Sequence, residues 1–199
     1  MLCRARTRLL AAATAVLATA LMATTAGATT IDVPAPIGIP PGTTAPAEEV
    51  SGLVRAVTTA SCRGAHGRPG VTSSGTLRKA TLCLVNRARG ASGRRALRAN
   101  SRLALAAWRH AADMARRNYF DHVSPQGRGP MARARAVGWR GSIGEVLLAG
   151  SPELATPAAT VDAWLRSPPH RAVLLGNSRM AGTGMVIRGG NVRWVMNLG

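Results

Sequence analysis

The end of the chain, between Gly184 and Leu198, restricts the fold more than any other segment. Two runs rich in β-branched and apolar residues, 184–188 and 191–198, flank a diglycine. Glycine readily adopts the positive φ angles that a two-residue hairpin turn requires. The pattern therefore predicts an antiparallel β-hairpin at the C-terminus.

Helices are predicted ahead of this hairpin, because apolar residues recur at helical spacing and capping residues precede several of these segments. A further strand is predicted around residues 143–148, next to the hairpin in the same sheet. Several helices with a small antiparallel sheet predict an α+β domain. The expected helices cover residues 77–89, 101–117 after a cap at Asn100 or Ser101, 130–138, and 157–165 after a cap at Thr156.

The N-terminal residues have the pattern of an export signal. Three arginines precede an apolar run, 9–23, and small residues follow at 26–28, as in secretory signal peptides. The apolar run is shorter than the roughly 20 residues that span a bilayer, although an uncleaved N-terminal anchor is the alternative. Residues 1–28 are predicted to be a signal peptide and 29–50 a proline-rich linker. The mature protein is predicted to be secreted, without a transmembrane helix.

Two cysteines, Cys62 and Cys83, lie outside the predicted signal peptide. An even number of cysteines in an exported chain favours a disulfide. This bond would tie an irregular N-terminal extension, residues 51–75, to the helix that contains Cys83. The folded domain is predicted to follow, over residues 76–199.

The chain is strongly basic, with 26 lysines and arginines against 8 acidic residues and a formal net charge of +18. Nucleic acid is a common partner of such chains, but the export signal argues against it. We expect anionic cell-wall polymers or lipid surfaces instead, attracted over long distances in a way that salt screens. An arginine surface that only keeps the protein soluble is the alternative. The protein is expected to be a monomer.

Four side chains are candidates for chemistry: His110, His122, Glu145 and His170. Their spacing forms no local motif, and each histidine has a structural explanation as a cap, a helix start or a packed helix residue. Glu145 lies within the apolar run IGEVLLAG, where a buried acid needs a partner. No serine or cysteine has the context of a nucleophile, so the catalytic residues remain unknown.

The order of five segments resembles the CAP superfamily, which holds cysteine-rich secretory proteins, antigen 5 and pathogenesis-related proteins, and in particular its bacterial SCP-like extracellular branch. The resemblance covers residues 76–199 and implies a three-layer α-β-α sandwich with a central antiparallel sheet and an open cleft. In several members two histidines and acidic residues in this cleft bind a divalent metal, often zinc. By motif, His122, Glu145 and His170 match such ligands. The segments are LCLVNRAR, HAADMARRNYFDHVSPQG, IGEVLLAG, WLRSPPHRAVLL and GTGMV…RWVMNLG.

The chain departs from this family pattern at three positions. Val146 and Val173 replace asparagines, and Pro169 replaces a glycine. Two amides that would orient neighbouring groups by hydrogen bonding are thereby lost. Two secondary candidates remain: Asp162 as a substitute for a second acid of the family, and Arg171 as a ligand for an anion.

Three functions follow from the sequence and the resemblance. The first is a secreted binding module of the cell envelope, with a cleft of two histidines and one glutamate that holds zinc or another divalent metal. The second is a metal-assisted hydrolase of envelope or peptide substrates, so enzymatic activity is undecided. The third is a structural or interaction protein with a vestigial cleft.

Overall fold

The computed structural model describes residues 47–58 and 61–199. The predicted signal peptide, 1–28, and most of the predicted linker lie outside the described residues. The described part of the chain forms, in order, α1 Ala47–Thr58, α2 Ser74–Ala91, β1 Arg98–Ala99, α3 Ser101–Arg117, α4 Pro130–Arg135, β2 Gly144–Gly150, α5 Pro157–Arg166, α6 Pro168–Leu174, β3 Met180–Arg188 and β4 Asn191–Leu198.

The sheet has the strand order β1-β3-β4-β2. The strands β3 and β4 form the predicted hairpin, whose turn glycines Gly189 and Gly190 have φ angles of 55° and 71°. The strand β2 pairs antiparallel with β4, which confirms the strand predicted around residues 143–148. The short strand β1 pairs in parallel with β3 and was not predicted, because two residues are too few to show a period.

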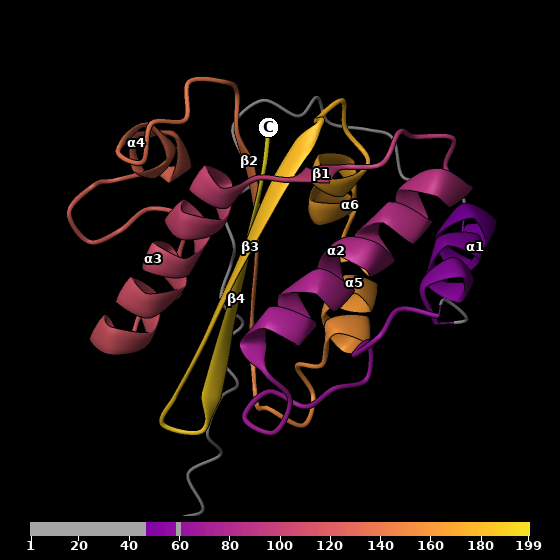
Figure 1. Ribbon diagram of the computed structural model, residues 1–199, viewed down its shortest axis with the longest axis horizontal. Coiled ribbons are helices and arrows are strands. Elements are labelled where there is room, and N and C mark those ends of the chain that lie inside the picture. Colours follow the sequence, from indigo (N-terminus) through magenta and orange to yellow (C-terminus); the bar gives the residue numbers. More distant parts are fainter. Residues whose placement is uncertain (1–46, 59–60) are drawn as a thin grey trace, which may run out of the picture. The chain divides into compact units, whose positions relative to one another are not determined.

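Helices cover both faces of this sheet, which confirms the predicted α+β sandwich of three layers (Figure 1). Helix α3 packs on one face, and helices α2 and α5 pack on the other. Side chains alternate between the faces along each strand. On β2, Leu147 packs with α3, whereas Val146 belongs to the larger core formed with α2 and α5.

Two glycines of β3 let helix α3 lie directly on the sheet. A Cβ at Gly182 would overlap the backbone of Leu103 and Ala104, and a Cβ at Gly184 would overlap the backbone of Ala107 and Trp108. The contact is therefore made between backbones, so no side chain could rotate to make room for a Cβ. This close approach determines how deep the residues of α3 sit above the strands.

The predictions of a linker that ends at residue 50 and of an irregular segment over residues 51–75 were both wrong where they meet, because residues 47–58 form helix α1. This helix carries Glu48 and Glu49 in its first turn, where the helix dipole favours negative charge. Its Leu53 is 2% exposed and belongs to the core, and the helix packs on α2 and α5. Val50, Leu53, Val54 and Val57 recur at helical spacing, so the sequence did carry a signal for this helix, and packing on α2 and α5 stabilises it.

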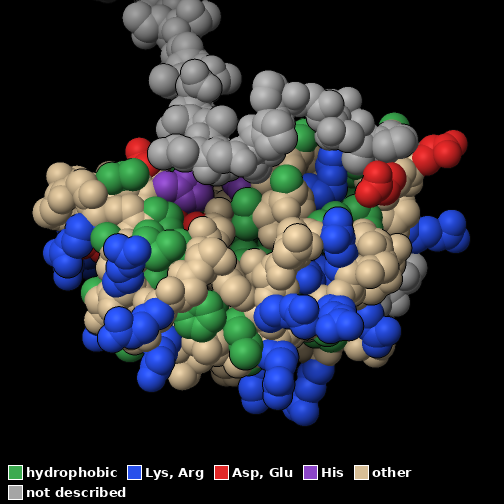
Figure 2. All heavy atoms as spheres, turned by 90° about the horizontal axis from the view of Figure 1, so that it is seen from above, with side chains coloured by type: hydrophobic (Ala, Val, Ile, Leu, Met, Phe, Trp, Pro, Cys, Tyr) green, Lys and Arg blue, Asp and Glu red, His purple; other side chains and the backbone are tan. Residues whose placement is uncertain are grey.

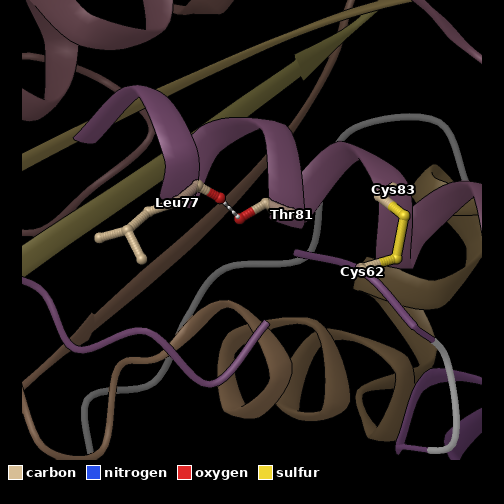
Figure 3. Close-up of a disulfide and its surroundings, with 4 residues drawn as sticks. All are labelled: Cys62, Leu77, Thr81 and Cys83. Atoms are coloured by element: carbon tan, nitrogen blue, oxygen red, sulfur yellow. Dashed lines mark hydrogen bonds between the residues drawn. A yellow bond between two sulfur atoms is a disulfide. The ribbon is translucent and has the colours of Figure 1, made fainter. Parts of the chain in front are cut away.

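A disulfide joins Cys62 to Cys83 of helix α2, as predicted (Figure 3). The two Cα atoms lie 6.0 Å apart, and 21 positions separate the residues in sequence. On the same helix the Thr81 hydroxyl donates to the carbonyl of Leu77, so this buried polar group is satisfied. The bond anchors the segment before α2 to the larger core. None of the described helices is long and apolar enough to cross a membrane.

Replacing both cysteines with serine is expected to lower the free energy of unfolding by about 3 kcal/mol, because the bond restricts the unfolded chain. Urea unfolding of the oxidised wild type and the double variant, followed by circular dichroism, measures this difference. Reduced wild type is the control and should match the variant. A loss below about 0.5 kcal/mol would show that the bond adds no constraint.

Candidate functional site

Glu145 lies at the centre of the candidate site. It is the second residue of β2, and the pairing register places it opposite Asn197 of β4. Glu145 shares the α3 face of the sheet with Leu147, two residues further along the strand. Its side chain is only 1% exposed, so its carboxylate depends on protein groups for hydrogen bonds.

Three side chains satisfy this carboxylate. Arg133 Nη2 donates to both Oε1 and Oε2, each at 2.8 Å. His122 Nδ1 donates to Oε1 at 2.9 Å. The Asn197 amide has one orientation that satisfies both of its neighbours, in which it donates to Oε2 at 3.0 Å and accepts from the Ala107 amide at 3.2 Å. The buried charge is therefore paired and fully hydrogen-bonded.

Arg133 also ties the site to its surrounding loop. Its Nη1 donates to the carbonyl of His122 at 2.8 Å and to that of Arg128 at 2.6 Å. The side chain comes from α4, a short helix that starts at Pro130, where proline fits the first helical position. One guanidinium thus holds β2, α4 and the loop that carries His122. No local pattern in the sequence distinguishes Arg133 from the arginines around it.

His110 of α3 lies beneath this cluster. Its ring is buried, with Nε2 donating to the carbonyl of Asp121 at 2.9 Å and lying 4.0 Å from Glu145 Oε1. Burial lowers the pKa of His110 below its ordinary value, although the charge of Glu145 opposes this shift. The Arg133 and His122 charges act in the same direction as burial. His110 is therefore a neutral, packed residue of its helix.

His170 is the third residue of α6 and is half-buried. Burial, followed by the positive charge of His122, lowers its pKa, so the two imidazoles are close enough to interact. Among the described residues its ring has no hydrogen-bond partner. Figure 2, which looks onto the upper end of Figure 1, shows histidine side chains together at the surface with arginine side chains elsewhere on the same face.

The Glu145 carboxylate does not fit the role of a ligand to a divalent cation in this arrangement. Within residues 47–58 and 61–199, no three His, Cys, Asp or Glu side chains gather as a metal site would require. Both oxygens of Glu145 already accept from the guanidinium of Arg133, so the carboxylate has no free lone pair to offer a metal. The bond from His122 Nδ1 to Glu145 leaves the other ring nitrogen of His122 free, as in many metal-bound histidines. Zinc at these residues stays a prediction.

The secondary candidates have other partners. Asp162 pairs with Arg166 one turn further along α5, at 3.0 Å. Arg171 was a secondary candidate for binding an anion, with a solvated arginine as the favoured alternative, and the structure shows neither. Arg171 is 7% exposed, and its Nη1 donates to the carbonyl of Leu165 at 2.8 Å, which joins α6 to α5.

The positions that depart from the family pattern have structural explanations. Val146 points away from Glu145, into the core on the opposite face of the sheet. Val173 packs so closely over Gly144 that a Cβ there would lie 2.8 Å from its Cγ1. The amide that orients Glu145 is supplied by Asn197, which no sequence motif connects with Glu145. Pro169 lies in the first turn of α6, where proline is tolerated.

Residues 82–198 match the CAP family, described as the cysteine-rich secretory protein family. The chain belongs to this family. The matched residues include Glu145 and the three side chains that bind its carboxylate, which we call the Glu145 cluster: His122, Arg133 and Asn197. No curated protein sequence matches the chain.

Solved structures of bacterial CAP proteins have the same fold. An outer surface protein from Borrelia burgdorferi superposes with a TM-score of 0.59 at 19% identity, over 64% of this chain and 95% of that one. An extracellular SCP-domain protein from Bacillus anthracis has a TM-score of 0.52 at 22% identity, over 65% of this chain and 44% of that one. A cysteine-rich secretory protein from Staphylococcus aureus has a TM-score of 0.51 at 16% identity, over 64% and 40%.

These similarities establish the architecture of the CAP domain. The chain spans almost all of the Borrelia protein but less than half of the Bacillus and Staphylococcus chains. The shared part is therefore a single CAP domain, which in the two longer chains is only one portion of the protein.

Proposed function

We propose that this CAP domain is a binding module of the cell exterior that recognises anionic polymers or surfaces through its arginines. Its structural relatives are described as outer-surface, extracellular or secretory proteins, and the sequence begins with the pattern of an export signal. The observation that carries the proposal is an excess of arginine that the acidic residues do not neutralise.

Four of the acidic side chains already have arginine partners. Asp113, Glu145, Glu153 and Asp162 form ion pairs with arginines at distances between 2.6 and 3.7 Å. Many other arginines have no acidic partner among the described residues and are exposed. Figure 2 shows Lys and Arg side chains spread over one face. An uncompensated cationic surface attracts polyanions over a distance set by the ionic strength.

The Glu145 cluster supports a binding module over a hydrolase. A general base or a metal ligand must offer a free oxygen to water or to the metal. Neither oxygen of Glu145 is free. Oε1 accepts from Arg133 and His122, and Oε2 accepts from Arg133 and Asn197. The cluster acts instead as a rigid anchor for α4 and the loop before it, and activity would require Arg133 to leave the carboxylate.

Co-sedimentation of the purified protein with isolated bacterial cell walls tests the proposal. We expect the bound fraction to fall at least about tenfold when sodium chloride is raised from about 50 to about 500 mM, because salt screens the attraction. Walls stripped of anionic polymers should bind little at either concentration. The variant His122→Asn is the control, because it changes the cleft and leaves every arginine in place.

Two results would contradict the proposal. Equal binding to intact and stripped walls would show that anionic polymers are not the partner. A turnover of wall or peptide substrates that is lost in a folded His122→Asn protein would favour the hydrolase.

A further inference from the structure

We infer that a pocket between α3 and α4 binds a phosphate group carried by a small molecule or by the end of a polymer chain. This inference rests on the proposed function, because it names a specific site for the anion. The pocket has a volume of about 370 Å³, at the lower end of the roughly 300–1,000 Å³ typical of ligand sites. Five arginines line it: Arg109, Arg116, Arg117, Arg128 and Arg133.

The fold brings these arginines together from three places. On α3, Arg116 and Arg117 follow Arg109 by seven and eight positions, a spacing that puts all three on one side of the helix. Arg128 comes from the loop after α3, and Arg133 comes from α4, which lies beside α3 (Figure 1). The convergence depends on tertiary structure and is invisible in the linear sequence.

The acid in the pocket wall is already neutralised. Asp113 accepts from Arg116 at 2.6 Å and from the Tyr119 hydroxyl at 2.8 Å, and it lies 3.7 Å from Arg117. Burial acts to raise the pKa of Asp113, but the bond from Tyr119 and the two arginines outweigh it and lower the pKa below its ordinary value. The carboxylate is therefore ionised and already bound by Arg116 and Arg117 of its own helix and by Tyr119, which follows the C-cap of that helix.

Two guanidinium groups remain for a ligand. The side chains of Arg109 and Arg128 line the pocket and have no hydrogen-bond or ion-pair partner among the described residues. A guanidinium presents a planar fork of donors that matches two oxygens of a phosphate. Two such forks facing one hollow suit a phosphate, whose several oxygens carry more charge than a carboxylate.

A buried hydroxyl adds a polar group to the wall. Ser124 is 8% exposed, and its Oγ accepts from the Arg128 amide at 3.2 Å. Its hydroxyl hydrogen has no acceptor within the described part of the chain, and the neighbouring Gln126 amide is also without a partner there. Both groups line the pocket and can donate to oxygens of an anion or of an attached sugar or polyol.

Isothermal titration of the full chain with inorganic phosphate, and separately with glycerol 3-phosphate, tests the site. The pocket variant is Arg109→Gln/Arg128→Gln. The matched control is Arg87→Gln/Arg95→Gln, which removes the same charge from exposed arginines outside the pocket. We expect the pocket variant to raise Kd at least about tenfold and the control to change it by less than about twofold. Losing a bidentate contact weakens binding more than losing a distant charge that salt screens.

A second variant separates the pocket from net charge. Ala136 is exposed and lines the pocket, so Ala136→Trp fills the space while keeping all five arginines. We expect it to abolish phosphate binding without changing the far-ultraviolet circular dichroism. Unchanged binding by Ala136→Trp, equal losses in the two arginine variants, or no binding by the wild type would each overturn the inference.

Binding measurements on the same proteins distinguish a lipid surface from a soluble phosphate as the ligand. They also show whether the pocket inference and the proposed function fail separately. If vesicles of phosphatidylglycerol bind while neither small phosphate does, the anion is a lipid surface and the pocket inference is wrong. If the pocket variant keeps its phosphate affinity while wall binding stays salt-dependent, only the pocket inference fails. If phosphate binds in the pocket but isolated walls are not bound, the proposed function fails and the phosphate site stands.

Discussion

Replacing Arg133 with alanine is expected to lower the free energy of unfolding by about 3–5 kcal/mol, the range for removing one partner of a buried ion pair. The Glu145 carboxylate is 1% exposed and would lose the cation that contacts both of its oxygens. The carbonyls of His122 and Arg128 would lose their donor as well. Urea unfolding at neutral pH measures the change.

A control on the same helix isolates the effect of the buried pair. Arg135→Ala removes an equal charge from an exposed position and should cost less than about 0.5 kcal/mol. The double variant Arg133→Met/Glu145→Gln removes both charges and should recover part of the loss, because no unpaired ion remains. If Arg133→Ala and Arg135→Ala were equally mild, Arg133 would not be the partner of the buried acid.

Replacing Gly182 with alanine is expected to cost about 3 kcal/mol or more, at or above the usual range for overpacking. The new Cβ would overlap the backbone of Leu103 and Ala104, so helix α3 would have to move off the sheet. This helix carries His110 and three arginines of the proposed phosphate pocket. A thermal melt gives the loss of stability, and phosphate affinity should fall with it.

The same substitution at Gly90 should have the opposite sign. Gly90 lies within α2, where nothing stands within 4 Å of an added Cβ. Alanine there removes the entropic cost of a helical glycine and is expected to stabilise the protein by about 0.5–1 kcal/mol. If Gly182→Ala were as well tolerated as Gly90→Ala, the close approach of α3 to β3 would be wrong.

Much of the fold could be predicted because its signals are local. The diglycine hairpin, the capped helix after Asn100 and the pairing of two cysteines each depend on a short stretch of sequence. Strand β1 could not be predicted in this way, because its two residues show no period and it pairs with β3, which is distant in sequence. Helix α1 does have a local signal, the helical spacing of Val50, Leu53, Val54 and Val57, and its prediction as linker and irregular chain overlooked that signal.

The candidate site was only half visible in the sequence for the same reason. A lone acid inside an apolar strand indicated that Glu145 needs a partner, and this was correct. The identity of the partner depends on tertiary structure, since Arg133 is one arginine among many in its segment. Asn197 becomes a neighbour of Glu145 only through the β2–β4 register. A buried acid in a sequence therefore predicts that a cation lies near it, and the tertiary structure decides which one.

Zinc calorimetry on the wild type tests the central claim most directly, which is that Arg133 and not a metal neutralises Glu145. The double variant His122→Asn/His170→Asn and the single variant Glu145→Gln serve as comparisons, with circular dichroism to establish that each is folded. We predict that the wild type binds no zinc stoichiometrically and that the folded variants behave alike. One zinc per chain in the wild type, lost in a folded Glu145→Gln protein, would contradict the account.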